Sequence, residues 1–260
     1  MPRTSRPKAI LDTSTIIEAI KYPEFRQLIN SKSGQTDIYT LYYVMFELKT
    51  GLIASFIEFY DTVVAYDDIS RAKIAWSEHI GRKEKNGHIL DGLIAKYADS
   101  IQFKDVSDYL SKIEATILAV SETINTLILD LRGSFADNKV AKYEIFSRDG
   151  YADFQKLCKT DFPNLEHFWL EHKDKLSSLI KDETLNSSKY KKMYYALVRI
   201  NSNLSKANSV RTRNQVGDAV IAVDTPAKYQ ITTIDNIYLE FTKLIPISVD
   251  HLSKIKSATS

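Results

Sequence analysis

The N-terminal part of the chain twice places a short apolar run before a helical pattern that carries an acid. Residues 9–11 (AIL) end at Asp12 and lead into apolar residues at helical spacing. Residues 37–41 (DIYTL) lead into a second helical stretch, which contains Glu47. Apolar runs of this length predict buried strands. A strand–helix–strand–helix opening is typical of a parallel sheet covered by helices.

The C-terminal part repeats this order. Asp218 lies in the first turns of a predicted helix, and residues 229–233 (YQITT) read as a strand that ends just before Asp235. A helix over residues 237–244 and a short strand over residues 245–249 follow. Neither end carries enough strands for a sheet of its own. We therefore predict that the two ends complete one sheet.

The middle of the chain has almost entirely helical spacing. Apolar residues recur at intervals of three and four over residues 105–131, 165–180 and 190–204. We therefore predict an α/β fold in which residues 1–66 and 208–260 form one domain with a mostly parallel sheet flanked by helices. Residues 67–207 would form a large, all-helical insertion.

Composition restricts the class of protein. The chain has 260 residues, of which 44% are apolar and 26% charged, and its net charge is +2, so any basic surface must be local. Cys158 is the only cysteine, which excludes an internal disulfide and a zinc site built on cysteines. No apolar run approaches the roughly 18 residues of a membrane span. We predict a cytoplasmic protein without a signal peptide or membrane segment.

Each of the four acids has an ordinary structural explanation. Asp12 could cap a helix, and Glu47 could be a solvated helix residue. Asp218 could be a negative charge that the helix dipole favours near an N-terminus, and Asp235 could belong to a turn. Together they suggest more, because the carboxyl ends of parallel strands meet at one edge of a sheet. Four carboxylates gathered there would repel one another unless a cation neutralised them. Hard cations such as Mg²⁺ or Mn²⁺ prefer oxygen ligands of this kind.

Four short motifs occur in an order that resembles the PIN-domain nucleases: ILDTS (10–14), FELKTGL (46–52), GDAVIA (217–222) and TTID (232–235). The resemblance covers the two ends of the chain. It implies a metal-dependent endoribonuclease that hydrolyses RNA, although DNA also suits such chemistry. It assigns catalysis and the binding of Mg²⁺ or Mn²⁺ to Asp12, Glu47, Asp218 and Asp235, with Ser14 and Thr233 as polar helpers. Asp12, at the end of the innermost strand, would be the central ligand.

Several further interpretations follow from this resemblance. The protein could be a toxin or defence effector, with its helical middle binding a protein partner or selecting the substrate. The alternative is a non-enzymatic interaction module on a degraded nuclease scaffold. A degraded site usually loses an acid, and none of the four is missing. The pattern makes no prediction about the oligomeric state.

Asp91 competes with Asp218 for the third acidic position. It lies in GHILDGLIAKYA (87–98), which resembles the motif around Asp218 and follows Glu47 more closely. We favour Asp218, because a short connection joins its helix to the strand that leads to Asp235, and short connections usually join neighbours in space.

Three basic residues lie close in sequence to the acids. Lys49 is two residues beyond Glu47, and Arg211 and Arg213 are predicted to lie in the loop before the helix of Asp218. If the acids converge, these cations would lie at the rim and could hold phosphates of a nucleic acid. A solvated, charged loop explains the two arginines equally well.

Overall fold

The computed structural model describes residues 6–80, 92–96, 102–135, 164–181, 183–187 and 189–252. Its strands are β1 (Lys8–Leu11), β2 (Asp37–Leu41), β3 (Leu131–Arg132), β4 (Tyr229–Thr233) and β5 (Ser248–His251). Its α-helices in the N-terminal half are α1 (Thr13–Lys21), α2 (Pro23–Ser33), α3 (Tyr42–Glu47), α4 (Ala54–Tyr66), α5 (Ile69–Ile80) and α7 (Val106–Leu127). Those in the C-terminal half are α10 (Leu165–Glu171), α11 (Lys173–Lys181), α12 (Lys191–Ser202), α13 (Val210–Asp224) and α14 (Ile237–Phe241). A π-helical segment, η1 (Leu48–Ile53), joins α3 to α4, and two 3₁₀ turns are η2 (Glu183–Asn186) and η3 (Leu204–Lys206).

The strands of the described part of the chain form one five-stranded sheet in the order β3-β2-β1-β4-β5. All neighbouring strands are parallel. β1 lies at the centre, where Leu11 is paired with Thr40 of β2 on one side and with Thr232 of β4 on the other. The two ends of the chain therefore share one sheet. The predicted α/β class, with a parallel sheet flanked by helices, is confirmed.

The middle of the chain is not entirely helical, so this part of the prediction is wrong. The helix predicted through residue 131 ends at Leu127, and β3 then adds a fifth strand beside β2. Backbone pairing begins before β3, because the N–H of Leu129 donates to the carbonyl of Ile38 over 2.7 Å. Residues 67–207 thus contribute to the sheet. Their status as an insertion stays a prediction.

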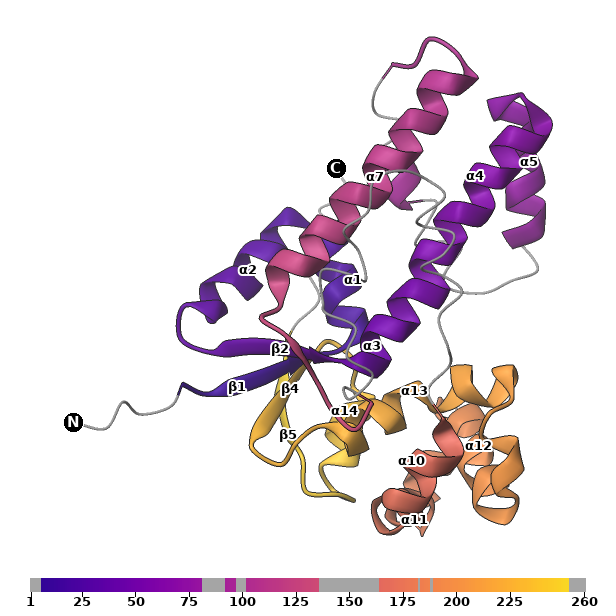
Figure 1. Cartoon of the computed structure of the whole chain (residues 1–260). Helices are drawn as coiled ribbons and strands as arrows, with labels where there is room; N and C mark the ends of the chain where they lie inside the picture. Colours follow the sequence, from indigo (N-terminus) through magenta and orange to yellow (C-terminus); the bar gives the residue numbers. More distant parts are fainter. Residues whose placement is uncertain are drawn as a thin grey trace.

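The long helices form two groups around the sheet (Figure 1). In the first group α4 packs against α5 and α7, and α7 also contacts α1 and α2. In the second group α10, α11 and α12 gather beside α13, with α11 and α12 in contact with α13. α13 also contacts α3 and α14, and so it joins the second group to the part of the fold that carries the acids.

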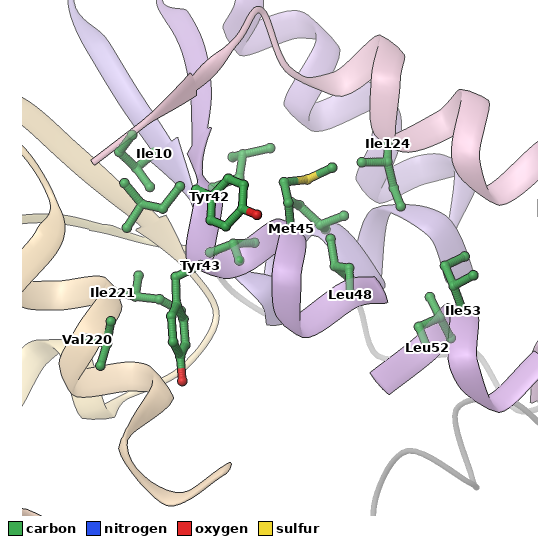
Figure 2. Packing of buried hydrophobic residues seen from close by; sticks show 14 of the residues in the cluster. Ile10, Tyr42, Tyr43, Met45, Leu48, Leu52, Ile53, Ile124, Val220 and Ile221 are labelled. Carbon is green, nitrogen blue, oxygen red and sulfur yellow. The ribbon is translucent and has the colours of Figure 1, made fainter. Parts of the chain in front are cut away.

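Helix α3 is held by apolar contacts on both sides. Figure 2 shows Tyr43 beside Ile221 of α13, whereas Met45 points towards Ile124 of α7. All four side chains are almost fully buried. Burying a side chain such as Met or Ile contributes about 1.5–3 kcal/mol. This packing fixes the position of Glu47, the last residue of α3.

Candidate active site

Asp12 follows β1 directly and forms the N-cap of α1. Its Oδ1 accepts a hydrogen bond from the N–H of Thr15 over 2.9 Å. Its Oδ2 accepts from the Ser14 hydroxyl over 2.8 Å and from the Thr233 hydroxyl over 2.7 Å. The side chain is buried. The capping role considered from the sequence is therefore real, and it leaves Asp12 as a buried carboxylate held in one orientation.

The pKa of the Asp12 carboxyl is raised above its ordinary value. Burial is the largest cause, because a charged carboxylate is less stable away from water. Hydrogen bonds from Thr15 and Thr233 act in the opposite direction, and the charge of Asp235 raises the pKa slightly further. Repulsion between the acids, which the sequence analysis anticipates, is therefore a smaller influence than burial.

Asp235 lies two residues beyond the end of β4 and is tied to Asp12 through Thr233. The Thr233 hydroxyl donates to Asp12 and accepts from the backbone N–H of Asp235 over 2.9 Å. β4 is the neighbour of β1, and its register places Thr232 opposite Leu11, immediately before Asp12. The hydroxyls of Ser14 and Thr233, the two predicted helper positions, both donate to Asp12.

Glu47 lies between the start of α1 and the middle of α13. Its Oε2 accepts a hydrogen bond from the Thr13 hydroxyl. Its Oε1 lies so close to Gly217 that a Cβ placed on this glycine would be 2.1 Å away. Gly217 directly precedes Asp218. The absence of a side chain at Gly217 therefore lets Glu47 reach the turn of α13 that carries Asp218.

The phenol of Tyr238 shows that the four acids share one region. The pKa of this buried side chain is raised well above its ordinary value, mainly by burial. The remaining contributions come from Asp218, Asp12, Glu47 and Asp235, in decreasing order. Each carboxylate therefore lies within electrostatic range of the same hydroxyl. We call these four residues the acidic edge.

The acidic edge opens towards solvent and is not a closed metal centre. Asp12 is buried, Glu47 and Asp235 are half-buried, and Asp218 is exposed. In the described part of the chain, no three His, Cys, Asp or Glu side chains are grouped so that they could hold a metal ion as they stand. Convergence on one cation thus stays a prediction.

The predicted basic rim is only partly present. Lys49 is 5% exposed within η1, so it is not placed to meet a phosphate at the surface. Arg211 and Arg213 lie on α13, which begins at Val210, so the loop predicted there is wrong. Arg211 is exposed, whereas Arg213 is half-buried and its carbonyl accepts a hydrogen bond from the Tyr43 hydroxyl over 3.2 Å.

The choice between Asp218 and Asp91 stays a prediction. Asp91 lies outside the described residues, as does Cys158. The short connection from α13, which carries Asp218, to β4 is present.

Three residues of this region were missed from the sequence: Thr13, Gly217 and Tyr238. Thr13 and Gly217 are next to predicted site residues, and Tyr238 follows Asp235 by three positions. Nothing in their spacing shows which of them reach the acids. Their contacts are made across elements that are distant in the sequence.

Comparisons with known proteins give no match: no family model, curated protein or solved structure matches this chain. The interpretation of the acidic edge therefore rests on its own geometry and chemistry. Of the helices that the structure describes, none combines the length and apolar character needed to cross a membrane.

Proposed function

We propose that the protein is a divalent-cation-dependent nuclease that hydrolyses phosphodiester bonds within RNA at the acidic edge. The observation that carries this proposal is a chain of contacts between the four acids. The Thr233 hydroxyl links Asp12 to the backbone of Asp235, and Glu47 contacts Thr13, beside Asp12, and Gly217, beside Asp218. The all-parallel sheet flanked by helices is compatible with the PIN-like fold that the motifs resemble.

The donor set fits a hard cation in its chemistry, because every donor is an oxygen. Asp12, Glu47, Asp218 and Asp235 would hold Mg²⁺ or Mn²⁺. Such a cation lowers the pKa of a bound water and offsets the negative charge that develops on the phosphate. The raised pKa of Asp12 also suits this role, since an adjacent positive charge would favour its ionised form.

The protein's own contribution is orientation. The hydroxyls of Ser14 and Thr233 fix Asp12, and the hydroxyl of Thr13 fixes Glu47. These hydrogen bonds hold the Asp12 and Glu47 carboxylates in defined orientations before a cation and a substrate arrive, which favours catalysis. The exposed Arg211 is available to hold a phosphate of the nucleic acid.

The test is cleavage of end-labelled RNA and DNA oligonucleotides of the same sequence with Mg²⁺, Mn²⁺ or EDTA. We expect internal cleavage of RNA only when a cation is present, and loss of cleavage in Asp12→Asn. Asparagine is also a good N-cap, so this variant keeps the helix start. Circular dichroism would verify its fold. Full activity of folded Asp12→Asn, or no cleavage by the wild type with either cation, would refute the proposal. Preferential cleavage of DNA would reassign the substrate.

Asp218→Ala and Asp91→Ala form a matched pair for the third acid. We expect Asp218→Ala to weaken Mn²⁺ binding and cleavage strongly and Asp91→Ala to behave like the wild type. Thermal melting in a Mn²⁺ series measures the binding part, because a ligand of the folded state raises the melting temperature. The reverse result would move the assignment to Asp91.

The alternative is a non-enzymatic interaction module on a degraded nuclease scaffold. One observation favours it: the described carboxylates are not already grouped around a cation site. This alternative predicts that the wild type neither cleaves RNA nor responds to Mn²⁺. The role as a toxin or defence effector, the protein partner of the helical middle and the cytoplasmic location stay predictions.

A further inference from the structure

Tyr238 has a buried hydroxyl that lacks a hydrogen-bond partner among the described residues. Its side chain is among the largest that are fully buried, and its ring packs edge-on against Phe241 at 5.9 Å between centroids. The ring alone would satisfy this packing. Burying a hydroxyl without a partner is costly, so an unpartnered one in a well-packed region needs an explanation.

Tyr43 provides an internal comparison. It is also buried beside the acidic edge. Burial raises the pKa of its phenol, and the charges of Glu47 and Asp218 raise it further. Its hydroxyl nevertheless has an acceptor, the carbonyl of Arg213 at 3.2 Å. A buried tyrosine in this region can thus obtain a backbone partner, whereas Tyr238 obtains none in the described part of the chain.

Tyr238 lies on α14, which packs against α13, the helix that carries Asp218. The negative charges of all four carboxylates of the acidic edge act on its hydroxyl. Asp218 has the largest influence of the four carboxylates on this phenol, followed by Asp12. A phenol ordinarily titrates at about pH 10, so the Tyr238 hydroxyl keeps its proton at neutral pH and can donate a hydrogen bond. Asp218 is therefore the candidate acceptor, because its helix contacts α14 and its charge has the largest influence of the four on this hydroxyl.

We propose that Tyr238 is a positioning residue of the acidic edge, whose hydroxyl donates to a carboxylate oxygen once a divalent cation has drawn the carboxylates together. This inference rests on the proposed function. It gives the unpartnered hydroxyl a partner in the cation-bound state. Groups that hydrogen-bond to metal ligands orient those ligands, and their loss typically lowers metal affinity about 10- to 100-fold.

The proposal predicts that Tyr238→Phe affects the protein differently without a cation and with Mn²⁺ bound. Without a cation, removing an unpartnered buried hydroxyl leaves the melting temperature unchanged or raises it. With Mn²⁺, the variant lacks the donor, so its Mn²⁺ affinity falls about tenfold and its cation-induced rise in melting temperature shrinks. A purely structural hydroxyl would change both states alike.

The experiment compares wild type, Tyr238→Phe and Tyr43→Phe by thermal melting in EDTA and in a Mn²⁺ series, with Mn²⁺ affinity from calorimetry. Tyr43→Phe is the matched control: it loses the bond to Arg213 in both states, so it should melt earlier throughout with an unchanged Mn²⁺ affinity.

The outcomes separate the two proposals. Wild-type Mn²⁺ binding with unchanged affinity in Tyr238→Phe would overturn the inference and leave the nuclease proposal intact. A lower melting temperature of Tyr238→Phe in EDTA would also overturn it, because the hydroxyl would then have a partner without a cation. No Mn²⁺ response in the wild type would overturn the nuclease proposal itself, and the inference with it.

Discussion

Two buried carboxylates, Asp12 and Asp224, differ in how their oxygens are satisfied. Asp12 is 1% exposed and receives three hydrogen bonds, spread over both oxygens. Asp224, the last residue of α13, is 5% exposed. Its Oδ1 accepts from the N–H of Ser134 over 2.6 Å, but its Oδ2 has no partner among the residues described. Two carboxylates with similar burial therefore differ in hydrogen bonding, because only Asp12 has partners for both of its oxygens among the residues described.

Asp224 joins three parts of the fold. Ser134 belongs to the loop after β3, and its hydroxyl lies 3.0 Å from Nε2 of His172, between α10 and α11. Gly133, in the same loop, packs directly against the Asp224 carboxylate. We call these four residues the Asp224 junction. Burial raises the pKa of both carboxyls, and the two regions differ in hydrogen bonding: both oxygens of Asp12 are bonded, whereas one oxygen of Asp224 lacks a partner among the described residues.

The pKa values of Asp224 and His172 are both shifted by their surroundings. Burial raises the pKa of its carboxyl to about 6, against the hydrogen bonds from Ser134 and the charge of Lys175, both of which lower it. Glu171 raises it slightly. Burial also lowers the pKa of His172, with a further contribution from Lys175. The Asp224 junction thus contains a carboxyl that titrates near neutral pH.

The largest expected effect is that of Gly133→Ala. Gly133 has φ of 98°, and a Cβ there would lie 2.1 Å from Oδ2 of Asp224, which is buried and cannot retreat. Backbone strain and overpacking together should lower the free energy of unfolding by about 4 kcal/mol. Urea denaturation measures this loss. Gly92→Ala is the control, because nothing lies within 4 Å of its Cβ position. Equal losses in the two variants would contradict the close packing at Asp224.

The second effect is a dependence of stability on pH. The Asp224 carboxyl has a pKa of about 6 in the folded state, against an ordinary value of 3.8. The folded state therefore binds more protons between these values, so this group's stabilisation is present below about pH 4 and is lost as the pH rises through 6. The difference between the two pKa values corresponds to about 3 kcal/mol in the free energy of unfolding.

Asp224→Asn isolates this contribution. Urea denaturation of the wild type and the variant at pH 4, 5, 6 and 7.5 should show the variant gaining relative stability as the pH rises. A constant difference across the series would show that Asp224 has an ordinary pKa.

The third effect concerns the hydroxyl that ties β1 to β4. Thr233→Val keeps the shape but removes the donor to Asp12 and the acceptor for the N–H of Asp235. We expect the free energy of unfolding to fall by about 2 kcal/mol, because a buried charged group loses a hydrogen bond. Thr242→Val is the control. The Thr242 hydroxyl donates to the carbonyl of Leu239 at an exposed position, where water can replace the lost hydrogen bond. Similar costs at both positions would mean that Asp12 does not depend on this bond.

The smallest effect on stability should be that of Gly217→Ala, the counterpart of Gly133→Ala at the acidic edge. The new Cβ would again lie 2.1 Å from a carboxylate oxygen, here Oε1 of Glu47. Glu47 is half-buried, so its side chain can move into solvent at the cost of its hydrogen bond from Thr13, and alanine favours a helix over glycine by about 1 kcal/mol. The unfolding free energy should change by less than about 1 kcal/mol, whereas the Mn²⁺-induced rise in melting temperature should shrink. A loss as large as that of Gly133→Ala would remove the contrast between the two regions.

Sequence patterns predicted the central sheet better than its edge. Residues 37–41 and 229–233 were predicted as strands and are β2 and β4. β3 was missed because Leu131 continues the apolar helical spacing of α7. Its strand conformation depends on pairing with β2, which is a tertiary contact. The start of α13 was missed because its first turns carry few apolar residues, although Ser209 caps the helix.

The acidic edge was predictable where it depends on neighbouring strands. Asp12 and Asp235 follow β1 and β4, and parallel strands bring their carboxyl ends together. The burial of Lys49 and the contact between Glu47 and Gly217 depend on how α3, η1 and α13 pack, which local patterns do not encode.

The central position of β1 has a consequence for protein synthesis. β1 and Asp12 leave the ribosome before β4, and the Thr233 hydroxyl that bonds to Asp12 follows 221 positions later. Asp218 and Asp235 also belong to this later part of the chain. A growing chain therefore carries Asp12 and Glu47 without the other half of the acidic edge while the residues between them are translated. If the acidic edge cleaves RNA, the nascent protein cannot do so until Asp218 and Asp235 have been translated, so it cannot cut its own messenger before then.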